Sequence, residues 1–342
     1  MKDLRPSAKP LADDLESPPM NDLAAQILIE LPAGDGPVSV GDALEHQRRA
    51  IVALPGMSDD DARAYLAREH YFRTWERAQE AAGRMIDRRF EAAADAIVAG
   101  DIATLGDLLE LDPSLARARS AYGHRQTLLQ HCAANGIEWP RQRQTTKNIR
   151  EAARMLLDAG AEPDATCESY RGDDTAMTLL CSSTHPAEAG MQAGLVETLV
   201  ARGAAVDGPN GDSAPLWTAI VWGYPAAADA LSRAGARMDN LVLAAGAGNL
   251  ERVKELVDAP HERLRIVGTD RWLDAEHMIS YALIYAAGCN RRGVVEFLLT
   301  RGPDLAITDP IYDATALGFA KYEHPAAGRP HGYPEIIALL SR

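Results

Sequence analysis

The sequence predicts an all-α chain built from repeated pairs of short helices. A helix ending close to L-L-x-x-G-A recurs as LLDAGA, LVARGA, LSRAGA and LLTRGP, which end at Ala161, Ala204, Ala236 and Pro303. The glycine of this ending repeats 32 residues after Gly203, at Gly235, and again about twice as far on, at Gly302. Apolar residues make up 46% of the chain and aromatic residues only 6%, which suits closely packed short helices.

A second pattern recurs in step with the first. Segments close to T-P-L-x-x-A-A-x-x-G read TLLQHCAANG (127–136), APLWTAIVWG (214–223) and ATALGFAKYE (314–323). Each precedes a glycine-ended helix or the end of the chain, so each predicts the first helix of a pair. The glycine has a physical role, because a chain that leaves a helix through a left-handed residue pays least when that residue is glycine.

Together these patterns resemble the ankyrin repeat, whose period is 33 residues, over roughly residues 90–342. The resemblance implies an all-α ankyrin-repeat solenoid of about seven helix-pair units. Three segments occur in a fixed order along the chain: EHYFRTWERAQ (69–79), then HCAANG with the long insertion after it, then SSTHPAEAG. That order resembles a group of bacterial ankyrin-repeat proteins whose roles are mostly unassigned.

The domain organisation follows from these boundaries. Residues 1–37 are rich in proline and acidic residues and are expected to form a mobile N-terminal segment; residues 38–89 are expected to form a helical cap. Residues 90–342 hold the repeats, with insertions near 137–151 and 260–274. A solenoid has open ends, so the N-terminal helices are expected to cover the first repeat.

Three helices are expected in the cap. One spans about 42–54. The next begins at Ser58, with Asp61 where the reciprocal carboxylate of a capping box belongs, and the third begins after Thr74.

Charge and composition exclude several classes of function. The net charge of −14 disfavours binding to nucleic acid or to anionic membranes. The first 20 residues contain no apolar signal-peptide core, and no apolar run approaches the ~18 residues of a membrane span. We therefore expect a soluble, cytoplasmic protein without membrane contact.

Sites for metals and cofactors are not predicted. The four cysteines show no zinc-ligand spacing, and Cys132 and Cys181 are interpreted as buried free thiols. The P-loop, G-x-S-x-G, H-E-x-x-H and EF-hand motifs are absent from the sequence. We expect no metal and no cofactor.

A protein partner is the first prediction for binding. In an ankyrin stack, the two residues before the glycine that ends each first helix face a concave groove. Here they are Ala134, Asn135, Ser182, Ser183, Val221, Trp222, Gly246, Ala247, Gly288 and Cys289. Trp222 is the predicted anchor, because an exposed indole contributes strongly to interfaces, and Ser183 is a second contact. The alternative is that Trp222 packs against a neighbouring insertion.

A histidine-containing site is the alternative prediction. His131 and Asn135 are spaced to share one face of a helix, and His185 follows the first helix of the next repeat. Such groups suit acid–base catalysis. The alternative is that His131 is a core residue at the helix interface, which is the more frequent role of a lone histidine at such a position.

The insertion after the first of these helices carries three cations, Arg141, Arg143 and Lys147. On an acidic protein they predict a local site for a small anionic ligand with a carboxylate or phosphate group. The alternative is that the arginines pair with nearby acids such as Glu138 and Asp173. The sequence thus favours a non-catalytic protein that binds a protein partner through the groove. The alternative is an enzyme or small-molecule sensor with a pocket at the second and third repeats.

Overall fold

The computed structural model describes most of the chain in two compact units, one ending at Ala189 and the other beginning at Gly190. The described residues are 22–135, 137–138, 141–142, 144–170, 172–323 and 332–341. Most of the predicted mobile segment and the insertion residues Trp139, Pro140 and Arg143 lie outside them. Each unit is described by itself.

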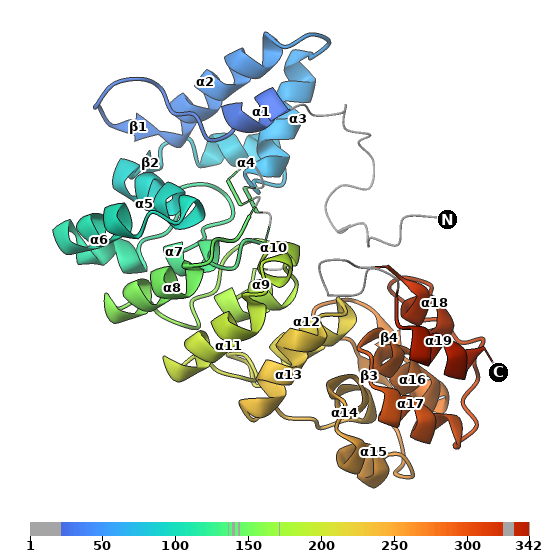
Figure 1. Cartoon of the computed structure of the whole chain (residues 1–342). Coiled ribbons are helices and arrows are strands. Elements are labelled where there is room, and N and C mark those ends of the chain that lie inside the picture. The colour runs from blue at the N-terminus through green and yellow to red at the C-terminus, as the bar shows by residue number, and fades with distance from the viewer. Residues whose placement is uncertain are drawn as a thin grey trace. The chain divides into compact units, whose positions relative to one another are not determined.

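The N-terminal cap begins the first unit (Figure 1). Its elements are α1 (Asp22–Ile27), β1 (Val38–Ser39), α2 (Val40–Val52), α3 (Asp59–Glu69), α4 (Trp75–Glu80) and β2 (Met85–Ile86). The two strands pair antiparallel, with Val38 opposite Ile86. The cap extends N-terminally beyond the expected boundary at residue 38, because Ile27 and Leu28 are buried in its core.

Local capping interactions start the cap helices as the sequence predicts. Ser58 accepts a hydrogen bond from the backbone N–H of Asp61, whose side chain bonds back to the backbone N–H of Ser58. The Thr74 side chain accepts a hydrogen bond from the backbone N–H of Arg77 in the first turn of α4. The helix after Thr74 is short and ends at Glu80, because the chain then turns into β2.

Helix pairs complete the first unit. They are α5 (Arg88–Ala99), α6 (Ile102–Leu111), η1 (Pro113–Arg117), α7 (Leu128–His131), α8 (Ile149–Asp158), α9 (Ala176–Cys181) and α10 (Thr184–Glu188). Helix α5 packs against both α6 and α7, and α7 packs against both α8 and α9. First helices therefore stack on first helices, which buries a continuous row of apolar side chains.

The second unit repeats this arrangement. Its helices are α11 (Gln192–Ala201), α12 (Ala214–Val221), α13 (Pro225–Arg233), α14 (Leu241–Ala247), α15 (Leu250–Leu256), η2 (Ala275–His277), α16 (Met278–Gly288), α17 (Arg292–Leu299), α18 (Ala316–Lys321) and α19 (Pro334–Leu340). The first helices α12, α14, α16 and α18 pack successively on one another, while α15, α17 and α19 form the second row. Helix α14 is buried at every residue and α16 at every residue except Ile279, because each lies between two repeats.

The fold class is the predicted one, an all-α stack of ankyrin-type helix pairs. In chain order, the described helices from α5 onward, apart from α10, alternate as seven first and seven second helices. The glycines that end the second helices are left-handed, with φ of 96° at Gly160, 94° at Gly203, 92° at Gly235 and 68° at Gly302. The glycine pattern in the sequence therefore marked these ends correctly.

The second predicted insertion, near 260–274, forms a hairpin. Strands β3 (Leu264–Arg265) and β4 (Trp272–Leu273) pair antiparallel, with Arg265 opposite Trp272. Leu273 faces the core, whereas the Trp272 side chain is exposed. None of the described helices is long and apolar enough to cross a bilayer.

Candidate functional site

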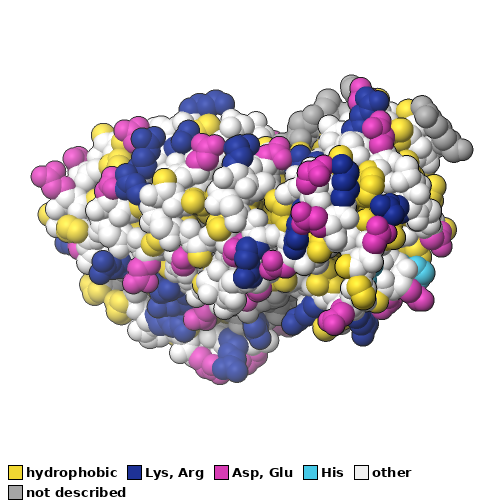
Figure 2. Space-filling model, turned by 90° about the horizontal axis from the view of Figure 1, so that it is seen from below, with side chains coloured by type: hydrophobic (Ala, Val, Ile, Leu, Met, Phe, Trp, Pro, Cys, Tyr) yellow, Lys and Arg dark blue, Asp and Glu magenta, His cyan; other side chains and the backbone are white. Residues whose placement is uncertain are grey.

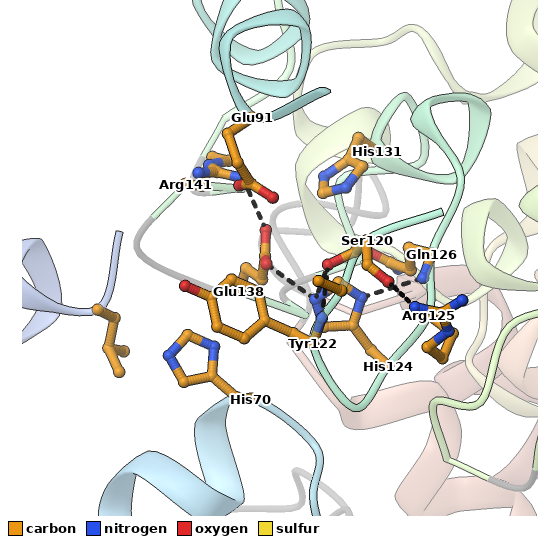
Figure 3. Close-up of polar contacts among 12 residues, drawn as sticks. His70, Glu91, Ser120, Tyr122, His124, Arg125, Gln126, His131, Glu138 and Arg141 are labelled. Carbon is orange, nitrogen blue, oxygen red and sulfur yellow. Dashed lines mark hydrogen bonds and ion pairs between the residues drawn. The ribbon is translucent and has the colours of Figure 1, made fainter. Parts of the chain in front are cut away.

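Buried polar side chains from six segments of the first unit meet around the described part of the first insertion (Figure 3). We call this group the polar cluster. Its members are Gln47, His70, Glu91, Asp95, Tyr122, His124, Gln126, His131, Glu138, Arg141 and Gln142. All except Asp95 are buried. Buried polar groups cost stability unless they are paired, so each contact within the cluster matters.

Arg141 joins three carboxylates from two parts of the chain. Its Nη1 lies 2.7 Å from Glu91 Oε2 and 3.1 Å from Glu138 Oε2, and its Nε lies 2.9 Å from Asp95 Oδ1. Glu91 and Asp95 are one turn apart on α5, so they present their carboxylates on the same side of the helix. One buried guanidinium thus links the insertion to the first repeat.

Glu138 also accepts a hydrogen bond from His124. The distance from His124 Nε2 to Glu138 Oε1 is 2.8 Å, and the backbone N–H of Gln126 donates to His124 Nδ1 at 3.1 Å. A nitrogen that accepts from a backbone N–H carries no proton, so the single proton of a neutral imidazole lies on Nε2. The contacts therefore favour neutral His124 as the donor to an ionised Glu138.

His131 lies beside His124, with their ring centroids 6.3 Å apart. Gln142 Nε2 donates to His131 Nδ1 at 2.8 Å, which leaves the ring proton on Nε2. That nitrogen is buried and has no hydrogen-bond partner among the described residues. The ring lies edge-on to Phe90, 6.0 Å between centroids. Burial lowers the pKa of His131 to about 3, so the ring is neutral at physiological pH.

His70 connects the cap to the cluster. Its Nε2 donates to Gln47 Oε1 at 2.9 Å, and its ring stacks on Tyr122 with centroids 4.0 Å apart. Gln47 Nε2 in turn donates to the carbonyls of Leu28 and Glu30. His70 Nδ1 is buried without a hydrogen-bond partner among the described residues, and burial lowers the pKa of His70 to about 3.

The pKa values of the two buried glutamates, Glu138 and Glu91, are shifted in opposite directions. Burial opposes the ionisation of Glu138, but the charge of Arg141 and the hydrogen bond from His124 hold its pKa well below the ordinary value. Burial raises the pKa of Glu91, and the attraction of Arg141 offsets only part of that effect. Neighbouring acids with divergent pKa values are a common property of functional sites and also of structural ion-pair networks.

Backbone strain is concentrated on the segments that carry this cluster. Positive φ angles occur at Tyr71 (59°), Arg125 (53°), Ala134 (45°), Glu138 (52°) and Tyr170 (47°). None is a glycine, and such conformations cost of order 1 kcal/mol or more each. The surrounding hydrogen bonds therefore maintain local conformations that the chain would not adopt alone.

The predicted pairing of His131 with Asn135 on one helix face is wrong. Helix α7 ends at His131, and the left-handed Ala134 turns the chain before Asn135. Both residues nevertheless contact Gln142, since the Asn135 backbone N–H donates to Gln142 Oε1 at 3.0 Å. The Asn135 side chain donates to Leu179 O and accepts from the Tyr170 hydroxyl, so it ties neighbouring repeats together.

His185 lies on α10, one third exposed, with its Nδ1 3.9 Å from Glu188. Burial lowers its pKa, and the Glu188 charge opposes this. None of the contacts described for His185 joins it to the polar cluster. The histidines that accompany His131 are instead His124 and His70.

The two described cations of the insertion, Arg141 and Lys147, do not form one site. Arg141 is buried and paired with Glu138, which is the alternative that the sequence left open, so it is not available to a ligand from solvent. Lys147 is exposed and donates to Ala189 O at 3.0 Å, which places the insertion beside the end of α10. Arg143 lies outside the described residues, so its predicted role stays a prediction.

Sequence reasoning missed His124 and His70 as members of the site. Both precede turns rather than lying on the periodic faces of predicted helices, and nothing in their local sequence indicates a partner. Glu138 was noticed only as an acid near two arginines. A buried network of this kind has no sequence signature, because hydrogen-bonded members lie up to 75 residues apart.

The predicted groove positions are mostly buried. Ser183 is 2% exposed and donates to Ala134 O at 2.6 Å, and Cys289 is fully buried, so neither can contact a partner directly. Among the groove positions of the second unit, Trp222 alone is only partly buried. It follows α12, directly before the left-handed Gly223. Trp222 therefore remains the predicted anchor that is open to contact.

The surface carries no extended region of one charge on the face shown in Figure 2. Acidic and basic side chains alternate there, with hydrophobic side chains between them. The described residues include no group of three or more His, Cys, Asp or Glu side chains placed to hold a metal ion. The predicted cysteines are free and buried.

Comparison with known proteins finds two solved ankyrin repeat domains with low similarity to this chain. No family model matches the sequence, and no curated protein matches it. The human ASB11 ankyrin repeat domain aligns with 16% identity and a TM-score of 0.39 over 72% of this chain and 96% of its own. The ankyrin repeat domain of Bcl-3, a member of the IkappaB family, aligns with 20% identity and a TM-score of 0.38 over 73% and 97%. These likenesses are weak, so the fold assignment rests on the helix pairs and their glycine ends.

Proposed function

We propose that this chain is a non-catalytic, cytoplasmic binding protein that holds a protein partner through the first-helix side of its second unit. The observation that supports this is the partial exposure of Trp222 among buried neighbours. Val221, Gly246 and Ala247 are buried, so Trp222 is the more accessible side chain among these groove positions. An accessible indole in such surroundings is well suited to anchor an interface.

The proposal is tested by capture with matched tryptophan variants. Proteins retained by the immobilised chain are quantified for the unmodified protein, Trp222→Ala and Trp272→Ala. Trp272 is the control, because it is 42% exposed on the β3–β4 hairpin and is the same residue type. A specific partner should be lost by at least about tenfold with Trp222→Ala and retained with Trp272→Ala, while far-UV circular dichroism stays unchanged.

Two outcomes would contradict this assignment. Equal retention by Trp222→Ala and the unmodified chain would remove the anchor. Loss of the partner only with Trp272→Ala would place the interface on the second insertion instead. The same comparison repeated with the purified partner would convert retention into a dissociation constant.

A second candidate function, small-molecule sensing or catalysis at the polar cluster, is supported by two ring nitrogens. His70 Nδ1 and His131 Nε2 are buried without hydrogen-bond partners among the described residues. Buried polar atoms are rarely left unpaired, so a bound polar molecule is one explanation. A high-resolution crystal structure should then show a non-protein atom within about 3 Å of either nitrogen. If that structure shows only apolar atoms around both nitrogens, this function is contradicted.

A further inference from the structure

A hollow of about 760 Å³ lies in the cap. It is bordered by the loop before β1, by α2 and by the first residue of α5. The apolar part of its wall comes from Pro32, Ala33, Pro37, Val38 and Ala50. Its volume falls within the range of small-ligand sites, roughly 300–1,000 Å³.

Two arginines border this hollow, Arg49, which pairs with Glu45, and Arg88. Arg88 Nη2 donates to Pro32 O at 2.8 Å and its Nε donates to Gly36 O at 3.3 Å. No carboxylate of the described part of the chain pairs with Arg88. Two neutral carbonyls fix the direction of the guanidinium without cancelling its charge, and Nη1 keeps its donors for another acceptor.

The two carboxylates that also border the hollow already have partners. Glu45 accepts from Arg48 Nε at 2.7 Å and from Arg49 Nε at 2.7 Å. The hydrogen bond from Arg48 is the main reason that the pKa of Glu45 falls to about 2. Asp42 accepts from the backbone and hydroxyl of Ser39 in the first turn of α2, where the helix dipole favours a negative charge. Neither carboxylate therefore serves as the counter-ion of the guanidinium.

We propose that the hollow binds a small organic monocarboxylate with an apolar body. The carboxylate would lie on the free edge of Arg88, since an oriented guanidinium matches the planar geometry of that group. The carbon chain would lie against Pro32, Pro37 and Ala50, which supply apolar contact. This ligand has the charge that the sequence predicts for a ligand, but the site is in the cap and not at the insertion.

The test uses the full chain with hexanoate as the probe. Millimolar hexanoate should raise the melting temperature, whereas hexanamide, which lacks the charge, and acetate, which lacks the apolar chain, should not. Arg88→Gln should abolish the shift, and Arg88→Lys should weaken binding by at least about tenfold, because lysine offers a point charge without the fork. Arg89→Gln is the matched control, since Arg89 is 56% exposed and pairs with Asp112 at 3.5 Å.

A further variant separates ligand binding from the loop contacts of Arg88. Ala50→Glu places a negative charge in the apolar wall on α2 and leaves the bonds from Arg88 to Pro32 and Gly36 in place. It should abolish the response to hexanoate while the unliganded melting temperature changes little. The absence of any shift with the unmodified chain, an equal shift with hexanamide, or a full response in Ala50→Glu would each overturn the proposal.

Discussion

Replacement of Arg141 by methionine tests whether one guanidinium holds the polar cluster together. Arg141 Nη1 lies 2.7 Å from Glu91 and 3.1 Å from Glu138, and both carboxylates are almost completely buried. Methionine has a similar reach but no charge, so both acids would lose their cation while remaining inside the protein. At neutral pH the free energy of unfolding should fall by about 3–5 kcal/mol, the cost typical of breaking a buried pair.

The pH dependence of this loss has a definite sign. In the unmodified protein the pKa of Glu138 is well below its ordinary value. Its ionised form therefore stabilises the fold above the unfolded-state pKa of about 4.3, and that stability disappears as the pH falls through the folded pKa. Without Arg141, burial raises the pKa of the carboxylates, so the variant loses stability as the pH rises. The deficit of the variant should thus be smaller at about pH 5 than at about pH 7.

Urea denaturation followed by far-UV circular dichroism at the two pH values measures both effects. Arg89→Met is the matched control, because Arg89 lies on the same repeat, is 56% exposed and pairs with Asp112 at 3.5 Å. Such a surface pair contributes only about 0–1 kcal/mol. The reasoning would be refuted if Arg141→Met cost less than about 1 kcal/mol or if its deficit were the same at both pH values.

Three further predictions concern packing, close backbone contact and acid stability. Leu156→Ala removes a fully buried side chain and should lower the free energy of unfolding by about 2–5 kcal/mol in the same assay; an unchanged midpoint would contradict the stack. Gly123→Ala should cost about 2 kcal/mol or more, because its Cβ would lie 2.3 Å from a backbone oxygen, whereas Gly293→Ala, with open space around it, should be neutral or stabilising. His70 and His131 stay neutral in the fold down to about pH 3, while unfolded histidine takes up a proton near pH 6.5. Stability should therefore fall as the pH drops below about 6.5, and His131→Gln should flatten that slope; an unchanged slope would contradict the burial argument.

Local sequence signals predicted the helix ends well. Ser58 with Asp61, and Thr74, start α3 and α4 as expected, and Gly160 ends α8 in the left-handed conformation. These features depend on residues within one turn of each other, so the sequence contains all the relevant partners. The first helix of the second repeat was predicted too long, because the turn at Ala134 depends on contacts with the insertion.

The candidate site could be predicted only in part. His131 was identified from its position on a first helix, and Glu138 from its nearness to Arg141. The same reasoning placed Arg141 at an exposed anion site, since a run of cations in a long loop usually faces solvent. What it lacked was Glu91, which lies 50 residues earlier and supplies the counter-charge inside the protein.

By itself, the sequence determined the helix-pair fold, the repeat ends and the acidic, cysteine-poor character of the chain. Periodicity, capping and glycine conformation act over a few residues, so they can be read without the tertiary structure. Only the tertiary structure decided which charges are compensated. Arg141 pairs with buried carboxylates, whereas Arg88 borders a hollow and donates to two carbonyl oxygens. Charge compensation depends on side chains brought together by folding from distant positions, and its energy depends on how much water the fold removes from around them.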